Sequence, residues 1–599
     1  MWAGFRSEFA YFSGFLRVLK ATKAATAVPS KTIGDHLREW AQRYGDRPAL
    51  ADDTQAYSYA ELDARANAYA RWALEQGFGK GDAVALMMPN RPEYMAIWFG
   101  LTRVGVAVAL VNIYLIGDSL AHSFAAVKAR AVIVEASLME TFATARDKVD
   151  DGLRLWAYGE TDSGGSRLDL AVAELSTAPL SAGQRPAIEI NDTALYVYTS
   201  GTTGLPKAAR ITHSRVLRAM FGFGAAIRGG ATDRAYLCLP MYHFNGGVLG
   251  PGMVLPYGGS AYIRERFSAS GFWRDVIREN CTLFIYIGEM CRYLLNAPPS
   301  PNDKAHKLRA CMGNGLRPDI FAEFQARFGV AAVLEFYAAT EGNAAMINLD
   351  SRPGAVGRVP TWGRSRFPME VVAFDHEANT QTRDADGHCI RCLPGEAGEL
   401  IAEILDDPSK PAARFDGYAD AAATRQKVLR DVFAPGDAWF RTGDLLRRDE
   451  LGYFYFVDRI GDTFRWKGEN VSTTEVAETL AMYPGVIEAA VYGVAVPNHD
   501  GRAGMAALVV ESMEKFDLPS LRAFLAEQLP AFARPQFLRF RTELDTTSTF
   551  RARKMDLVAD GFDPARTADP VYYDDRNAGA YVRVGETLIA GLNAGEIRL

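Results

Sequence analysis

Residues 199–207 have the sequence Thr199-Ser200-Gly201-Thr202-Thr203-Gly204-Leu205-Pro206-Lys207, and they follow an apolar run, residues 194–198, that is typical of a buried strand. Glycine allows the backbone to approach a ligand closely, so that successive N–H groups can converge on an anion. The hydroxyl groups add donors, and Lys207 adds a point charge suited to phosphate. The stretch therefore predicts a cradle for the phosphates of a nucleotide. The alternative is a flexible polar loop, and the spacing does not match a Walker-type phosphate loop.

Length and composition are those of an ordinary multidomain globular protein. A chain of 599 residues is too long for one hydrophobic core and predicts about two to four domains. The formal net charge of −6 argues against nucleic acid as a partner. Six scattered cysteines form no disulfide framework, which predicts a reducing compartment, the cytoplasm. Cys389 and Cys392 form a lone C-x-x-C pair beside His388, which offers too few ligands for a closed metal site, and no metal is assigned there.

Residues 1–30 combine aromatic and basic side chains. Apolar side chains recur every three or four positions, at Phe5, Phe9, Phe12, Leu16 and Leu19. The basic side chains Arg6, Arg17, Lys20 and Lys23 outnumber the one acid, Glu8. Such a helix suits the surface of a membrane, here its cytoplasmic face, and it equally suits docking on its own protein. No apolar run reaches the roughly 18–20 residues that span a bilayer, and the longest candidate, residues 104–116, fits a buried strand.

Helical and strand-like stretches alternate from residue 32 to about residue 190. Strands are predicted at residues 82–88 and 131–136, with a helix at residues 92–101 between them. Such alternation implies α/β layers with largely parallel sheets. Further buried strands are predicted at residues 284–287 and 333–336.

A domain boundary is predicted near residue 458. Beyond it, residues 471–482 favour a helix and residues 486–496 a strand, which indicates a smaller α+β module. Residues 556–599 show little periodicity and are expected to form an extension of that module. The predicted organisation is therefore an amphipathic segment, a large domain and a small one, at residues 1–30, 31–458 and 459–599.

The string Ser-Gly-Thr-Thr-Gly-x-Pro-Lys after a strand resembles the phosphate loop of the adenylate-forming superfamily, which includes acyl-CoA synthetases, luciferases and adenylation domains of peptide synthetases. The resemblance implies a large N-terminal domain of layered sheets and helices with a smaller, mobile α+β C-terminal domain. It also implies that the loop, from Thr199 to Gly204, binds ATP and AMP and that Lys207 acts in catalysis.

A second motif, Tyr337-Ala338-Ala339-Thr340-Glu341-Gly342-Asn343, follows a predicted strand and so should lie at the carboxyl end of a sheet, where α/β folds bind ligands. By resemblance, Tyr337 and Ala338 lie against the adenine, Thr340 hydrogen-bonds phosphate, and Glu341 holds Mg²⁺. A hard carboxylate suits that metal. In isolation the Thr-Glu pair could also be a helix cap. The superfamily usually has glycine at the position of Ala338.

Further motifs appear in the order that the superfamily has them. The resemblance implies that Gly313, Asn314 and Gly315 line the adenine and that Asp444 binds the ribose hydroxyls, with Arg459 beside it. His243 and Phe244 would adjoin the carboxylate of the acyl substrate. The pivot of the small domain would be Gly461, and Lys467 and Gly468 would face CoA. At the position of the superfamily's C-terminal catalytic lysine this chain has Arg551, which is expected to act in its place. The alternatives are that Lys554, three residues further on, supplies the charge, or that adenylation is slow.

A narrower resemblance covers about residues 32–590. The strings at residues 286–289, 313–318, 336–343 and 458–471, the last reading DRIGDTFRWKGENV, are similar to the fatty acid transport protein branch, which comprises very-long-chain and long-chain acyl-CoA synthetases. The resemblance implies an ATP- and Mg²⁺-dependent fatty acid–CoA ligase that forms AMP. A ligase that loads a carrier protein and a fatty acid binding or transport protein are the alternatives, and a homodimer is left open.

Overall fold

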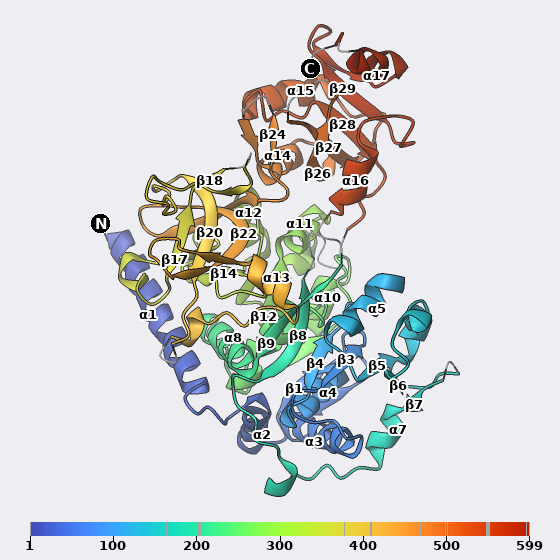
Figure 1. Ribbon diagram of the computed structural model, residues 1–599, viewed down its shortest axis with the longest axis vertical. Helices are drawn as coiled ribbons and strands as arrows, with labels where there is room; N and C mark the ends of the chain where they lie inside the picture. The colour runs from blue at the N-terminus through green and yellow to red at the C-terminus, as the bar shows by residue number, and fades with distance from the viewer. Residues whose placement is uncertain are drawn as a thin grey trace. The chain divides into compact units, whose positions relative to one another are not determined.

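The computed structural model describes residues 2–162, 164–199, 205–375, 378–407, 410–466, 469–497, 499, 501–546, 552–594 and 596–597 (Figure 1). The chain divides into two compact units. The first comprises residues 1–368, 402–429 and 438–440, and the second comprises residues 369–401, 430–437 and 441–599. This division describes compactness and does not test the predicted boundary of the mobile domain at residue 458.

The first unit contains two large sheets. One has seven strands in the order β7-β6-β5-β3-β4-β8-β9, and the other has eight in the order β15-β14-β13-β12-β10-β11-β1-β2. The seven strands are β7 (Ser166–Arg167), β6 (Arg154–Tyr158), β5 (Ala131–Glu135), β3 (Ala83–Met87), β4 (Ala107–Leu110), β8 (Thr193–Thr199) and β9 (Lys207–Thr212). The eight are β15 (Ala345–Asn348), β14 (Ala332–Ala338), β13 (Ala310–Asn314), β12 (Leu283–Ile287), β10 (Arg234–Leu237), β11 (Ser260–Ile263), β1 (Pro48–Ala51) and β2 (Ala56–Ser58).

Both sheets are parallel except at their edges. Strand β9 pairs antiparallel with β8, β15 with β14, and β2 with β1. The parallel strands need crossover connections, and helices supply them. Helices of the first unit include α2 (Ile33–Tyr44), α3 (Tyr59–Glu75), α4 (Pro92–Arg103), α5 (Gly117–Ala126), α8 (His213–Ala226), α10 (Phe272–Arg278), α11 (Gly288–Asn296) and α12 (Pro318–Phe328). The predicted α/β class is confirmed.

Local signals in the sequence placed several of these elements. Ser58 caps α3, because its hydroxyl accepts from the backbone N–H of Glu61 at 3.2 Å while the Glu61 carboxylate accepts from the N–H of Ser58 at 2.7 Å. The predictions of strands β3 and β5 and of helix α4 are confirmed to within two residues. The apolar run at residues 104–116 contains the buried strand β4, as predicted.

The second unit contains a five-stranded sheet in the order β26-β27-β28-β29-β30. Its strands are β26 (Val486–Ala495), β27 (Arg502–Val510), β28 (Phe537–Arg541), β29 (Val571–Asp575) and β30 (Ala580–Arg583). It is packed with helices α14 (Thr473–Ala481), α15 (Leu518–Gln528), α16 (Lys554–Asp560) and α17 (Glu586–Asn593). A separate sheet includes β17 (Met369–Val372), β20 (Ala397–Glu403), β22 (Ala438–Arg448) and β23 (Tyr453–Arg459).

The expectation that residues 556–599 form an extension is wrong. Strand β29 pairs antiparallel with β28, and β30 pairs with β29, so these residues complete the five-stranded sheet. Val571, Leu588 and Leu592 are buried in the core of the second unit. The sequence pattern for β29 and β30 is weak because both strands are short and mix tyrosine with charged residues. Only one or two apolar side chains per strand therefore indicate the buried face.

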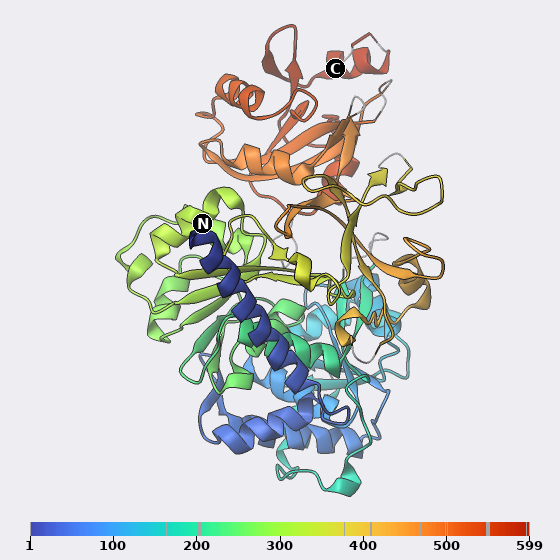
Figure 2. The ribbon, with the colours of Figure 1, turned by 90° about the vertical axis from the view of Figure 1, so that its left-hand side faces the viewer.

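Helix α1 (Trp2–Ala25) lies along the first unit, drawn in dark blue in Figure 2. Its inner face is docked: the Tyr11 hydroxyl donates to the carbonyl oxygen of Arg358 at 2.6 Å, and Arg17 Nε donates to the carbonyl oxygen of Ala225 at the end of α8 at 2.6 Å. Burial lowers the pKa of Arg17. Residues 1–30 were predicted either to bind a membrane surface or to dock on the protein itself. Docking describes this inner face of the helix.

A second, outer face of α1 is exposed. It consists of Phe9, Phe12, Leu16, Lys20 and Lys23, which a period of 3.6 residues places along one stripe. Phe9 is 67% and Leu16 46% exposed, and Phe12 meets the exposed ring of Trp362 edge to face at 5.4 Å. In the part of the chain that the structure describes, no helix is both long enough and apolar enough to cross a bilayer.

The docking of α1 can be tested at Tyr11. Tyr11→Phe should remove the hydrogen bond to the carbonyl of Arg358 and cost about 1 kcal/mol of local stability, or roughly a fivefold rise in the detached population. Trypsin cleavage at Lys20 and Lys23 should then become faster by a similar factor. Phe9→Ala, on the exposed face, is the matched control and should change little. Equal cleavage rates in the two variants would show that this hydrogen bond does not hold the helix.

Candidate functional site

The predicted phosphate loop joins two strands of the seven-stranded sheet. Thr199 ends β8 and Lys207 begins β9, and the antiparallel register places these two residues opposite each other. The structure therefore fixes both ends of the loop at the carboxyl end of β8. Ser200, Gly201, Thr202, Thr203 and Gly204 lie outside the described residues, and their phosphate-binding role stays a prediction.

The predicted adenine segment ends strand β13 of the other sheet. Gly313 is required there, because a Cβ atom would collide with the carbonyl oxygen and the ring of Tyr286 on β12. Gly315 adopts φ +80°, a left-handed conformation that favours glycine. Sequence patterns thus marked a turn whose shape only glycine fits.

A buried carboxylate holds this turn. Glu335 on β14 accepts from the backbone N–H of Gly315 at 3.0 Å and of Leu316 at 3.2 Å, and also from the hydroxyl of Tyr286. Burial raises the pKa of Glu335 to about 8, which the three donors partly counteract. Sequence analysis missed this role, because Glu335 appears there only as one polar residue in a strand.

The acyl-side segment is tied to the adenine segment. Asn245, two residues after His243, donates from Nδ2 to Asn314 Oδ1 at 3.0 Å. Asn245 begins a π-helical turn, Asn245–Leu249, a form that occurs often at functional sites. Burial lowers the pKa of His243 to about 4, so the imidazole is neutral at pH 7. His243 and Phe244 are each partly exposed, which leaves them accessible to a ligand.

Asn90 orients the chain just before His243. It follows β3, donates from Nδ2 to the carbonyl oxygen of Leu239 at 2.8 Å, and accepts at Oδ1 from the N–H of Met241 at 2.7 Å. This residue was also missed, because no local motif surrounds it.

The second motif forms a loop between β14 and β15. Tyr337 is buried at the end of β14, and Ala338 is exposed. Gly342 packs so closely on the ring of Phe440 that no Cβ would fit, and Asn343 Nδ2 donates to the carbonyl oxygens of Glu403 at 2.7 Å and Ala413 at 2.8 Å. Contacts on both sides of Thr340 and Glu341 therefore hold the loop in place.

Glu341 lies in a charged and hydroxylic environment. Its carboxylate pairs with Lys427 Nζ at 3.4 Å, and the side chain is 12% exposed. Tyr418 is buried near this carboxylate, and burial together with the Glu341 charge raises the pKa of its hydroxyl. A carboxylate with neighbouring oxygen atoms fits Mg²⁺, which binds few protein ligands and otherwise keeps water or phosphate oxygens. Within the described residues no group of three or more His, Cys, Asp or Glu side chains could hold a metal.

Residues 416–419 extend the sheet beyond β9. The N–H of Arg210 donates to the carbonyl oxygen of Gly417 at 2.9 Å, and the N–H of Ala419 donates to that of Ala208 at 2.8 Å. An isolated bridge between Ala209 and Tyr418 belongs to the same pairing. We call residues 416–427 the bracing segment. No sequence motif marks this segment.

Two partly buried arginines of helix α8 lie near the bracing segment. Arg215 donates to the carbonyl oxygen of Ala339 at 2.6 Å, and its pKa is lowered by burial despite the charges of Asp416 and Glu341. Burial lowers the pKa of Arg218 to about 10. The Mg²⁺ candidate Glu341 therefore faces positive potential from α8 as well as from Lys427.

The ribose candidates belong to the second unit. Register pairs Asp444 on β22 with Arg459 on β23, and Arg459 Nε lies 3.5 Å from Asp444 Oδ1. The structure thus brings together the two residues that the motif order associated. The Gly443 N–H, next to Asp444, donates to Glu399 at 3.2 Å, which fixes the turn of the motif. Binding of ribose by this pair stays a prediction.

The predicted pivot follows Arg459. Gly461 does not have a left-handed φ, and a Cβ atom added to it would meet no other atom within 4 Å, so this conformation does not itself require glycine. Nearby, buried Asp458 accepts from the N–H of Thr473 at 2.6 Å and so anchors the start of α14. Lys554 donates to Thr473 Oγ1 at 2.9 Å and lies 3.4 Å from Asp462. Lys467, Gly468 and Arg551 lie outside the described residues.

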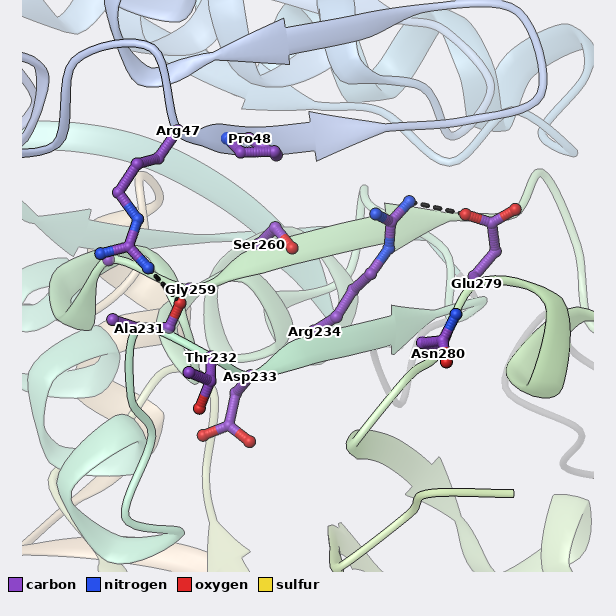
Figure 3. A pocket seen from close by; sticks show the side chains of 11 residues that line it. Arg47, Pro48, Ala231, Thr232, Asp233, Arg234, Gly259, Ser260, Glu279 and Asn280 are labelled. Carbon is purple, nitrogen blue, oxygen red and sulfur yellow. Dashed lines mark hydrogen bonds and ion pairs between the residues drawn. The ribbon is translucent and has the colours of Figure 1, made fainter. Parts of the chain in front are cut away.

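A surface hollow of about 330 Å³ opens on the first unit, near Arg47, Arg234 and Glu279 (Figure 3). Arg234 and Glu279 form an ion pair at 2.7 Å across it, and Arg47 reaches the carbonyl of Ala231. Arg234 and Ser260 are the first residues of β10 and β11, so the hollow lies at the amino ends of the strands. Ligands of α/β sheets bind at the opposite, carboxyl ends, and the hollow is therefore not the candidate site.

Comparisons with known proteins agree with this geometry. The model of the AMP-binding enzyme family matches residues 37–403, and that of the AMP-binding enzyme C-terminal domain matches residues 475–551. Long-chain fatty acid transport protein 1 of Mus musculus is 41% identical over 568 residues, which cover 93% of this chain and 87% of that protein. Long-chain fatty acid transport protein 3 of Homo sapiens is 42% identical over 524 residues, covering 87% and 76%.

Solved structures share the fold. ATP-bound MatB from Rhodopseudomonas palustris superimposes with a TM-score of 0.72 at 24% identity, over 88% of this chain and 98% of that one. A Mycobacterium tuberculosis fatty acyl CoA synthetase gives a TM-score of 0.60 at 23% identity, over 88% and 98%. The predicted large N-terminal and small C-terminal domains are confirmed at the level of fold. The chain therefore belongs to the AMP-binding, adenylate-forming enzyme family and, within it, to the long-chain fatty acid transport proteins.

Proposed function

We propose that the protein is a long-chain or very-long-chain fatty acyl-CoA synthetase, which uses ATP and Mg²⁺ to activate a fatty acid and transfers the acyl group to CoA. The observation that carries the proposal is that the bracing segment pairs with β9, the strand that follows the phosphate loop, while its last residue, Lys427, lies 3.4 Å from Glu341, the candidate metal ligand. The names of the relatives support a long acyl chain. Uptake of fatty acid would follow from trapping the acid as its CoA ester.

The first half-reaction needs electrostatic stabilisation more than a protein nucleophile. A fatty acid carboxylate oxygen attacks the α-phosphorus of ATP, the bond to the β-phosphate oxygen breaks, and pyrophosphate leaves with the electron pair. Lys207 and Thr340 would bind the phosphate oxygens on which charge develops. A magnesium ion held by Glu341 would neutralise phosphate charge. Neutral His243 and Phe244 would position the carboxylate without adding a competing charge.

The second half-reaction moves the acyl group to sulfur. The CoA thiolate attacks the acyl carbon, and AMP leaves with the oxygen that joined it to the acyl group. Rotation of the small domain about Gly461 would withdraw Arg551 from the adenylation site and bring the CoA-facing residues Lys467 and Gly468 to it. Asp444 and Arg459 would keep the ribose of AMP in place.

The choice of acceptor and of chain length gives the main test. With ATP and Mg²⁺, the protein should convert acids of about twelve carbons or more to CoA esters and release AMP, because each buried CH₂ contributes about 0.8 kcal/mol. A panel from acetate to very long chains, with CoA or an acyl carrier protein as acceptor, measures this. An optimum at acetate or butyrate would contradict the chain length. Transfer of the acyl group only to carrier protein would favour a ligase that loads a carrier protein. Binding of fatty acid without release of AMP would favour a binding or transport protein.

The basic residue for adenylation can be identified by pyrophosphate exchange, which reports the first half-reaction alone. Arg551→Ala should lose most exchange, while Arg551→Lys should keep or increase it, because a compact ammonium restores the usual donor. Lys554→Ala is the matched control and should change exchange little, since Lys554 is engaged with Thr473 and Asp462. An inactive Lys554→Ala beside an active Arg551→Ala would show that Lys554 is the catalytic residue.

The outer face of α1 is our candidate for contact with a membrane, peripheral and on the cytoplasmic side. Phe9 and Leu16 would enter the interface, and Lys20 and Lys23 would face anionic headgroups at about 1 kcal/mol each. This assignment leaves the docked inner face of the helix unchanged.

Flotation with phosphatidylglycerol vesicles tests the membrane contact. The pair Phe9→Glu and Leu16→Glu should reduce the bound fraction, and Lys20→Glu with Lys23→Glu should reduce it mainly at low salt, where charges are least screened. Turnover of a short soluble acid should stay unchanged. Leu170→Glu, at a side chain 58% exposed elsewhere on the first unit, is the control. Unchanged flotation of both α1 variants would refute this surface.

A further inference from the structure

Lys427 lies beside the candidate metal ligand but belongs to none of the motifs. It immediately follows helix α13 (Ala421–Gln426), and its Nζ is 3.4 Å from Glu341 Oε1. Its side chain is 27% exposed, and the ammonium also lies 5.7 Å from the centre of the Phe440 ring, on which Gly342 packs. A flexible cation therefore occupies the position next to Glu341.

The scaffold that holds Lys427 is continuous with the phosphate loop. The Thr424 hydroxyl accepts from the N–H of Tyr418 at 2.9 Å and donates to the carbonyl oxygen of Asp420 at 2.9 Å, which fixes α13 on the rest of the bracing segment. The bracing segment in turn pairs with β9, the strand that begins at Lys207. The position of Lys427 is therefore fixed by pairing with β9, the strand that directly follows the phosphate loop.

The two kinds of cation near Glu341 differ in side-chain chemistry. Arg215 is partly buried and donates to the carbonyl oxygen of Ala339, so its guanidinium is committed to the backbone of the loop. Lys427 has a four-carbon side chain and a compact charge that can change partners. Without a ligand, its ammonium balances the Glu341 carboxylate. When that carboxylate holds a divalent cation, the ammonium is repelled, and the phosphates bound by the same cation are the nearest strong acceptors.

We propose that Lys427 is a further substrate-binding residue, which pairs with Glu341 in the free protein and with the β- and γ-phosphates of ATP in the complex. The inference rests on the proposed adenylating function and deepens it. Because AMP lacks these two phosphates, Lys427 would favour ATP and pyrophosphate over AMP. It would stabilise the leaving group of the first half-reaction while leaving the AMP site of the second unaffected.

The test is the difference between ATP and AMP binding, measured by calorimetry in the presence of Mg²⁺. Lys427→Met should weaken binding of ATP and of pyrophosphate about tenfold, the loss expected for one charged contact, and leave AMP binding within about twofold. Lys427→Arg should retain most of the ATP affinity, because it keeps a phosphate-binding charge. Arg425→Met, an exposed cation two residues earlier on α13, is the matched control and should change neither affinity.

Other outcomes would overturn the inference. Equal weakening of ATP and AMP in Lys427→Met and Lys427→Arg would show that Lys427 only supports the structure of the loop. Unchanged ATP affinity in Lys427→Met would show that the ammonium does not reach the phosphates. Wild-type protein that binds neither nucleotide would refute the proposed adenylating function as well, whereas wild-type binding with an unaffected variant refutes this inference alone.

Discussion

The hydrogen bonds between β9 and the bracing segment are the constraint on which the candidate site depends. The phosphate loop belongs to the seven-stranded sheet, whereas the Glu341 loop and the adenine segment belong to the eight-stranded sheet. A site that uses both sheets needs a fixed connection between them. Pairing of residues 416–419 with β9 supplies it, because backbone ladders are directional, and the same bracing segment ends at Lys427, whose ammonium lies 3.4 Å from Glu341.

The two glutamates of the eight-stranded sheet illustrate how environment divides similar side chains between roles. Glu335 is fully enclosed among neutral donors, so that burial raises its pKa and its oxygens serve the backbone of the adenine turn. Glu341 is six residues further on, partly accessible, and surrounded by cations from two elements. The first carboxylate is suited to fixing a shape, and the second is suited to exchanging one cation for another. Sequence alone distinguishes them only through the motif around Glu341.

The sequence predicted the parts of the site that are local and failed where distant segments cooperate. Thr199 and Lys207 could be predicted because glycines, hydroxyls and a preceding strand all occur within one short stretch. Tyr418 and Lys427 could not, since their importance depends on a pairing with β9 some two hundred residues away in the chain. The same limit explains residues 556–599, whose strands become recognisable only when β28 offers an edge. Resemblance placed motifs in order, but it carried no information on the segments between them.

Helix α1 shows a related limit, because its composition is apolar on more than one side. A helix with one apolar stripe has a single way to bury it, and the sequence then predicts the docked face. Here Tyr11 and Arg17 lie on the inner face, while Phe9, Phe12 and Leu16 lie on the exposed face. Docking and membrane contact are therefore not exclusive, because they concern opposite faces of one helix. Docking to α8 fixes the orientation of α1. In this orientation the aromatic and basic side chains lie together on the exposed stripe.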